Sequence, residues 1–177
     1  HIFIADTQHE RIRAIDPNSG VIRTVAGSGG RAYGGDTSPA AEAHLFNPHD
    51  VSVDSEGRVV IADTYNGRVR RVGRDGVMTS IAGTGVGWDN GDGGPAVSAG
   101  LVRVEAVAHG PHGDIYVGDA AGRVRKIEAA SGMIATVAGN GVHGYSGDGG
   151  PAIAAKIGAP TAICFDGDGN LYFTDRD

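Results

Sequence analysis

The chain has 177 residues, a formal net charge of −6 and 31 glycines. A nucleic-acid partner requires a dense basic surface, so this acidic composition argues against one, and no apolar run is long enough to span a membrane. The single cysteine, Cys164, excludes an intrachain disulfide and lies in the apolar run 162–165, where we expect a buried structural thiol. The cellular compartment stays open on these features.

A unit of about 56 residues recurs three times along the chain. Its clearest marker is TVAG at 24–27, which returns as SIAG at 80–83 and as TVAG at 136–139. A fixed period of this size predicts a repeat architecture in which each unit buries its apolar face against its neighbours. The predicted units cover 1–56, 57–113 and 114–169, followed by an extra strand in 170–177 that aligns with the start of the chain.

The middle unit predicts four short strands joined by turns. Alternating apolar and polar residues, interrupted by glycine turns, mark strands at 50–54, 58–62, 68–72 and 77–81. A glycine-rich connector follows at 83–94, and a proline opens a predicted helical turn at 95–99. Four short antiparallel strands, repeated radially, are typical of a β-propeller blade. We therefore predict an all-β propeller with three four-stranded blades per chain; a longitudinal β-solenoid is the alternative.

The motifs of this unit resemble those of the NHL-repeat β-propeller family. They are Pro-x-x-Val-x-Val-Asp at 48–54, GRVVIADT at 57–64, NGRVR at 66–70 and the connector motif GDGGPA at 91–96. Members of this family bind proteins or RNA, sense ligands or carry metal-dependent enzymes, so the resemblance implies a fold more than an activity.

Propellers of this family usually have about six blades, within the range known for propellers, so three units would form half a ring. We expect two chains related by a twofold axis to close the ring as a homodimer. Both ends of the chain carry the second strand of a blade. A blade shared by two chains would therefore contain this strand twice, so one copy must be displaced or pair outside the blade. The alternative is that the chain is a piece of a longer array.

The innermost strand of each blade begins at the central channel, where ligand sites gather. In the 56-residue register the first side chains of these strands are His49, Glu105 and Thr161, a position at which the otherwise similar repeats differ. Two copies of His49 and Glu105 at one channel mouth would suit a divalent metal, zinc first and calcium second. Asp50 and Glu105 are the predicted catalytic carboxylates, with Asp50 acting as a partner of His49 or as a general base.

The segment 47–51 is also similar to a zinc-ligand segment of the peptidyl-hydroxyglycine amidating lyases, which implies a ligand role for His49. Six-bladed lactonases and phosphotriesterases, which hold a cation in the channel, offer a broader analogy. The sequence therefore predicts a metal-dependent hydrolase that attacks small esters, lactones or phosphotriesters with metal-activated water.

The three connectors carry large side chains that we predict to form the wall of a substrate site. These residues are Tyr33, Trp88, His143 and Tyr145. The same loop face could bind a protein or a peptide, which gives the alternative function of a non-enzymatic recognition propeller.

Two further patterns are predicted to be structural. Three aspartates recur with three arginines and should pair across a tight strand connection; they are Asp6 with Arg11, Asp63 with Arg68, and Asp119 with Arg123. The stretch 166–170 is similar to part of a calcium loop but matches a hairpin turn of the middle unit, and a turn is the preferred interpretation.

Overall fold

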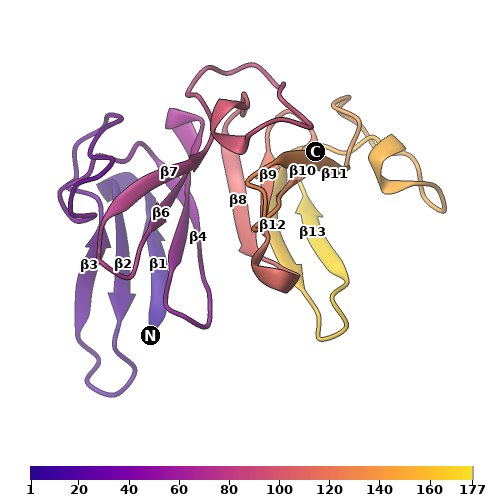
Figure 1. Ribbon diagram of the computed structural model, residues 1–177. Helices are drawn as coiled ribbons and strands as arrows, with labels where there is room; N and C mark the ends of the chain where they lie inside the picture. The colour runs from indigo at the N-terminus through magenta and orange to yellow at the C-terminus, as the bar shows by residue number, and fades with distance from the viewer. Residues whose placement is uncertain (177) are drawn as a thin grey trace.

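The computed structural model describes residues 1–176 and contains thirteen β-strands in four antiparallel sheets (Figure 1). The strands are β1 (Ile2–Asp6), β2 (Arg11–Ile15) and β3 (Ile22–Ala26); β4 (Pro48–Val53), β5 (Val59–Asp63), β6 (Arg68–Val72) and β7 (Met78–Ala82); β8 (Val104–His109), β9 (Ile115–Asp119), β10 (Arg123–Ile127) and β11 (Ile134–Ala138); β12 (Pro160–Phe165) and β13 (Leu171–Asp175). Short 3₁₀ helices lie at η1 (Thr7–His9), η2 (Thr64–Asn66), η3 (Ala96–Ser98), η4 (Pro111–Gly113) and η5 (Ala152–Ala154). Among the described residues, no helix has the length and apolar character needed to cross a bilayer.

The sheets follow the chain in order, and the second and third are complete. Their strands run β4-β5-β6-β7 and β8-β9-β10-β11, whereas the first sheet has three strands and the last has two. The all-β prediction is confirmed. The described strands form two four-stranded sheets rather than three, because the first sheet lacks an innermost strand and β12 and β13 begin a further one.

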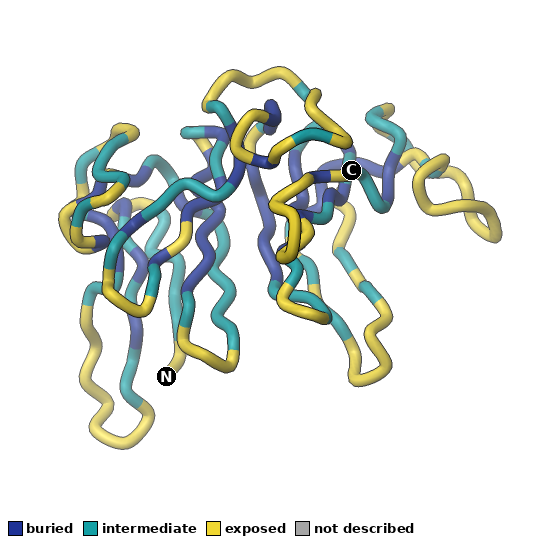
Figure 2. Tube along the Cα trace, viewed as in Figure 1, coloured by how far each residue is buried: buried dark blue, intermediate teal, exposed yellow. Residues whose placement is uncertain are grey.

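The buried residues lie between consecutive sheets (Figure 2). Leu45, Ile61 and Met78 are fully buried where the first sheet packs on the second. Val60, Val117 and Ile134 belong to the cluster between the second and third sheets. Burial of each large aliphatic side chain contributes about 1.5–3 kcal/mol, so each sheet depends on its neighbour for most of its stability.

The innermost strands β4 and β8 are joined by side chains as well as by packing. The Oδ2 atom of Asp50 accepts a hydrogen bond from the backbone N–H of Val107 at 2.9 Å. Two residues further along, the Oγ atom of Ser52 accepts the backbone N–H of His109 at 3.1 Å. Asp50 and Ser52 therefore face β8, whereas Val51 and Val53 pack toward the first sheet.

Each of the first two connectors also pairs with the outermost strand of the next sheet. In the first connector the N–H of Thr37 donates to the carbonyl of Met78 at 2.8 Å, and the N–H of Ala40 donates to that of Gly76 at 2.8 Å. The second connector repeats this pairing one sheet further on, with Gly93 to Ile134 at 2.8 Å and Ala96 to Gly132 at 2.9 Å. The connector thus acts as a fifth strand for the sheet that follows it.

The recurring aspartates do not pair with the predicted arginines. Asp63 lies directly opposite Arg68 in the register, yet its carboxylate contacts the guanidinium of Arg70 at 3.1 Å, and both side chains are fully buried. Arg68 instead donates to two carbonyls of the connector. In the first sheet Asp6 likewise contacts Arg13. The prediction was wrong about the partner: the opposite and the diagonal arginine both share the face of the aspartate, but the opposite one donates to connector carbonyls and leaves the carboxylate to the diagonal one.

The third sheet departs from this arrangement. Arg123 and Arg125 both turn to the connector, where Arg123 contacts Asp89 at 2.6 Å and Arg125 contacts Asp92 at 2.5 Å. Asp119 is left fully buried, with no hydrogen-bond partner for its Oδ2 atom. Burial, together with the nearby charge of Asp89, raises the pKa of Asp119 to about 7.

Cys164 is exposed, which corrects the prediction of a buried thiol. It lies on β12 at the position that Ser52 occupies on β4, and so it points to the side where a further sheet would pack. No sheet follows there in the described chain.

Candidate functional site

The predicted channel residues His49 and Glu105 meet in the structure. Each is the second residue of an innermost strand, His49 on β4 and Glu105 on β8. The Nδ1 atom of His49 lies 2.6 Å from Oε2 of Glu105. The carboxylate is 1% exposed, whereas the imidazole is 27% exposed. A buried carboxylate therefore holds an imidazole that reaches solvent.

The other ring nitrogen of His49 faces Asn47. The side-chain amide nitrogen of Asn47 lies 2.9 Å from Nε2 of His49, and an amide N–H can only donate. Nε2 is then the acceptor, and Nδ1 carries the proton that it donates to Glu105. In this tautomer Nε2 is unprotonated, as a general base requires, but its electron pair accepts the Asn47 amide, which a reacting water would have to displace.

Arginine side chains surround the second oxygen of Glu105. The Oε1 atom lies 3.0 Å from Nη2 of Arg103 and 3.9 Å from Nη2 of Arg176. Neither contact has hydrogen-bond geometry, so this buried oxygen lacks a well-aligned donor. The guanidinium of Arg103 also lies 5.4 Å from the centre of the Tyr65 ring. Two guanidinium groups thus lie within 3.9 Å of one buried carboxylate oxygen.

Three non-glycine residues with positive φ border this pair. Asn47 has φ 56° and Arg103 has φ 46°, at equivalent positions of two repeats. Glu10 has φ 55° and ψ 43°, the values of Gly67 in the next repeat, and its buried carboxylate accepts the backbone N–H of Asn47. Such conformations cost about 1–3 kcal/mol each and concentrate at functional sites.

Sequence reasoning missed these supporting residues, although one signal was visible. The position of Glu10 holds glycine in the other two repeats, at Gly67 and Gly122. A charged residue at a position that favours left-handed backbone is a departure that the repeat register exposes.

Asp50 occupies a different environment from the one predicted. Its two carboxylate oxygens accept the backbone N–H groups of Val51 and Val107. Burial raises the pKa of Asp50, and these two hydrogen bonds oppose the rise. The geometry makes Asp50 a link between β4 and β8, and its role as a catalytic base stays a prediction.

The predicted wall residues are spread over the connectors rather than gathered around His49. Trp88 is 71% exposed and Tyr145 is 82% exposed. Tyr33 stacks under the guanidinium of Arg68 at 4.0 Å and donates to Asp36, while Nε2 of His143 lies 3.0 Å from the carbonyl of Ala120. Contacts of this kind brace the loops, and substrate binding by these residues stays a prediction.

The donor set of one chain does not fit the predicted zinc. Within residues 1–176, no three His, Cys, Asp or Glu side chains lie together in a way that could hold a metal ion. Nδ1 of His49 contacts Glu105 and Nε2 accepts the Asn47 amide, so the pair could offer a metal at most one imidazole nitrogen, and only after Asn47 moves away. Protein zinc sites use three or four protein ligands, so no catalytic step is derived through a metal. Zinc or calcium held between two chains stays a prediction.

Known proteins support the fold. The structure superposes on an auxiliary nutrient binding protein from Bacteroides thetaiotaomicron with a TM-score of 0.70 and 15% identity, over 98% of this chain and 42% of that one. It superposes on a streptogramin B lyase with a TM-score of 0.62 and 16% identity, over 98% and 44%. A third match is a catalytically inactive histidine-to-alanine variant of virginiamycin B lyase from Staphylococcus aureus with quinupristin, with a TM-score of 0.53 and 16% identity over 96% and 43%.

These matches define the class of the molecule as a β-propeller-type fold. Within that class, the NHL-repeat model matches residues 47–72, so the chain carries an NHL repeat from the end of the first connector through β6. The chain spans about two fifths of the length of these solved structures. No curated protein sequence matches it.

Proposed function

We propose that the chain is a hydrolase of small esters, lactones or phosphotriesters in which His49, oriented by Glu105, acts as the general base. A water molecule that displaces the Asn47 amide gives its proton to Nε2 of His49 as its oxygen attacks the carbonyl or phosphoryl centre. The proton then passes to the departing alkoxide oxygen, which restores the neutral imidazole. Arg103, beside the pair, stabilises the negative charge that develops on the substrate oxygen.

One observation carries this proposal: the 2.6 Å contact between a buried carboxylate and an imidazole that reaches solvent. The carboxylate fixes the tautomer and stabilises the imidazolium that forms during proton transfer, as in other acid–base pairs. The similarity to a lyase whose histidine-to-alanine variant is catalytically inactive lends weight to histidine chemistry on this fold. At 16% identity that similarity concerns the fold, and it supplies no residue role.

The test is hydrolysis of p-nitrophenyl acetate and of a short-chain lactone by the wild-type chain and His49→Ala. Loss of a general base lowers the rate by about 10²–10⁴-fold. His9→Ala is the matched control, because His9 is an exposed imidazole with a carboxylate neighbour, Asp6, at 2.6 Å. Equal rates in the wild type and His49→Ala would refute the proposal, whereas an unchanged rate in His9→Ala shows that an exposed imidazole beside a carboxylate is not sufficient for hydrolysis.

We also propose that two chains close one ring of six blades. The third connector carries Gly149 and Ala152 at the positions of the pairing residues Gly93 and Ala96 of the second connector. In the described chain no sheet follows the third connector. The matching acceptors lie on the first sheet, which no connector precedes. They are the carbonyls of Ile22 and Gly20, equivalent to those of Ile134 and Gly132.

In such a ring β12 of one chain would become the innermost strand for the partner's β1, β2 and β3, and β13 would be displaced. The exposure of Ile22, at the edge of β3, agrees with a missing connector. A longer chain that supplies further repeats would cover the same edges, so the assembly needs a direct test.

Ala152→Pro tests the ring, because proline removes the N–H that would donate to the partner. The preceding Pro151 has φ −63° and ψ 129°, a conformation that tolerates a following proline. We expect light scattering to find dimers for the wild type and monomers for Ala152→Pro at an unchanged melting temperature. Ala96→Pro is the matched control, since it removes the same donor inside one chain and should lower the melting temperature instead. A wild type that is monomeric at high concentration contradicts the ring.

A second function, recognition of a protein or peptide by the connector face, is favoured by the exposure of Trp88 and Tyr145. The similarity to nutrient binding proteins fits this alternative. The two functions separate in one experiment, because a recognition propeller would keep its ligand in His49→Ala and lose it in a Trp88→Ala, Tyr145→Ala double variant.

A further inference from the structure

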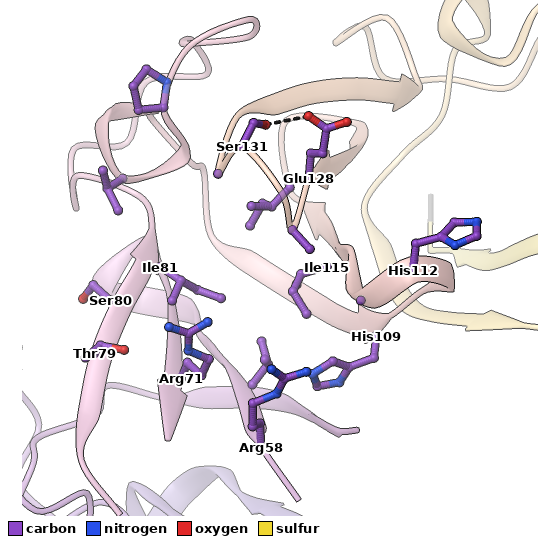
Figure 3. Close-up of a pocket in the computed structure, with 17 residues that line it drawn as sticks. Arg58, Arg71, Thr79, Ser80, Ile81, His109, His112, Ile115, Glu128 and Ser131 are labelled. Carbon is purple, nitrogen blue, oxygen red and sulfur yellow. Dashed lines mark hydrogen bonds between the residues drawn. The ribbon is translucent and has the colours of Figure 1, made fainter. Parts of the chain in front are cut away.

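A cavity of about 700 Å³ opens between the second and third sheets, away from the His49 site (Figure 3). Apolar side chains cover much of it, among them Val60, Ile81, Ile115 and Ile127. Its volume lies within the range of about 300–1,000 Å³ that small-molecule sites occupy. Neither the predicted hydrolase site nor the predicted connector face includes it.

Comparison of equivalent residues in the three repeats suggests why a cavity forms at this junction. Val60 on β5 is equivalent to Phe3 on β1 and to Tyr116 on β9. Tyr116 fills the next junction by stacking edge-on against Phe165, with ring centres 4.7 Å apart. Phe3 packs into the junction between the first and second sheets. Where the flanking junctions have an aromatic ring, the middle one has a valine.

The opposite wall of the cavity changes in the same way. His109 on β8 stands where Phe165 stands on β12. Its Nδ1 atom lies 2.9 Å from Oγ of Ser52, so the ring is held against β4 and does not fill the space. Val60 and His109 together replace the stacked aromatic pair of the next junction, which reduces the side-chain volume beside the cavity, although Val60 itself is fully covered by its neighbours.

The charged residues that line the cavity also differ from the equivalent residues of the third sheet. In the third sheet Asp114 and Lys126 form an ion pair at 3.5 Å. The equivalent residues of the second sheet are Arg58 and Arg71, two cations that both line the cavity. Arg58 is neutralised by Asp54 at its own turn. Within the described chain, Arg71 has no carboxylate partner.

Arg71 is also placed to serve the cavity. It lies directly opposite Val60 in the β5–β6 register, so the two side chains share one face of the sheet. Glu128, the acidic residue of the lining, stands on the other wall and accepts the hydroxyl of Ser131 (Figure 3). A ligand can therefore place an anionic group at Arg71 and an apolar body along the partly exposed Ile81, away from Glu128.

We infer that this cavity binds a small carboxylate with an aromatic or branched aliphatic body, its carboxylate on Arg71 and its body where the neighbouring repeats have an aromatic ring. A guanidinium binds a carboxylate through two parallel N–H donors, which favours this anion over a neutral isostere. The inference does not depend on the proposed hydrolase, because no residue of the His49 site takes part.

Titration of the ¹⁵N-labelled chain with benzoate, followed by amide chemical shifts, tests the inference. We expect saturable shifts at Val60, Ile81 and Ile115 with a dissociation constant of about 1 mM, in the range of a fragment-sized ligand. Benzamide, the neutral isostere, should bind about tenfold more weakly, which corresponds to one lost charged contact. Equal binding of benzoate and benzamide would overturn the role of Arg71.

Two variants test the position of the ligand. Val60→Tyr introduces the residue of the next repeat and should abolish the shifts. Arg71→Ala should weaken benzoate about tenfold and leave benzamide unchanged, while Arg23→Ala, which removes an exposed arginine of the first sheet, should leave both unchanged. Benzoate shifts that persist in a folded Val60→Tyr, or that fail to saturate in the wild type, would refute the site. If Val60→Tyr does not fold, Arg71→Ala with its Arg23→Ala control still tests whether Arg71 binds the carboxylate of the ligand.

Discussion

His49 and Glu105 lie 56 residues apart, at the same position of two successive repeats, and their side chains meet at 2.6 Å. A repeat protein brings equivalent residues side by side whenever its innermost strands are neighbours. Where two repeats differ at such a position, two different side chains therefore lie next to each other, here an imidazole and a carboxylate.

Glu105→Gln should reduce hydrolysis without removing it. The neutral amide can still accept a hydrogen bond from His49, but it no longer stabilises the imidazolium, so we expect a loss of about 10–100-fold, short of the effect of removing the base itself. The measurement is kcat with p-nitrophenyl acetate beside the melting temperature of each variant. An equal loss in Glu105→Gln and His49→Ala would show that the carboxylate has another role.

Glu10→Gly should separate stability from activity. The glycine accepts the left-handed backbone without the strain of about 1–2 kcal/mol, but the contacts of the carboxylate with Arg31 and the backbone of Asn47 disappear. We expect the free energy of unfolding to change by less than about 1 kcal/mol, because the two effects oppose each other. Hydrolysis should fall because Asn47 loses its anchor beside His49; unchanged hydrolysis would show that Glu10 is structural.

Asp119 should make the protein less stable as the pH rises. Its pKa is raised to about 7 in the folded state, well above the ordinary value of about 3.9 for an aspartate, so between these values the folded chain binds more protons than the unfolded one. The stabilisation is complete below about pH 4 and is lost as the pH rises through about 7, and the part lost between pH 5 and pH 8 is on the order of 3 kcal/mol. Urea denaturation at pH 5 and pH 8 measures it.

Asp119→Asn should abolish that difference, because the amide does not titrate. Asp63→Asn is the control at the equivalent position. It breaks the buried contact with Arg70 and should destabilise the chain by about 3–5 kcal/mol at both pH values. A pH dependence that survives in Asp119→Asn must come from another group.

Cys164 offers a chemical readout of assembly. In the single chain it is exposed and should react with Ellman's reagent at the rate of a free thiol. In a closed ring the partner's β4 would pack against that side of β12 and protect it, so protection should follow protein concentration in the wild type. Ala152→Pro should stay reactive at all concentrations; equal reactivity of both proteins at high concentration would contradict the ring.

The metal prediction has its own measurement. A single chain supplies at most one imidazole nitrogen at the pair, so a monomeric variant such as Ala152→Pro should bind no zinc by elemental analysis. Only a ring could bring a second His49 to the same mouth. About one zinc per two wild-type chains, lost in His49→Ala, would support a site shared between chains.

The fold was largely predictable, because strand alternation and glycine turns recur at a fixed period. The strand predicted at 68–72 is β6, and the one predicted at 50–54 is β4, which starts two residues earlier at Pro48. The prediction of three four-stranded blades counted repeats, whereas the alignment of both ends with the second strand of a unit already implied incomplete first and last sheets.

The site was only partly predictable. The register placed His49 and Glu105 together, but their bond as donor and acceptor depends on side-chain geometry that no spacing encodes. Asp50 carries a carboxylate, as Glu105 does, but the two oxygens of Asp50 accept backbone N–H groups of β4 and β8. The role of Asn47 follows from the backbone conformation at φ 56°, which cannot be inferred for a residue that also forms ordinary turns.

The pairing of each connector with the sheet ahead of it gives the chain a direction. In the proposed ring the donor edge of one chain would meet the acceptor edge of the next, so contact between chains would be head-to-tail. Head-to-tail contacts close into a ring when the rotation allows it and otherwise continue as a filament. If chains associate through these edges, the curvature of three repeats would decide between a closed particle and a polymer, and a single proline at Ala152 should prevent both.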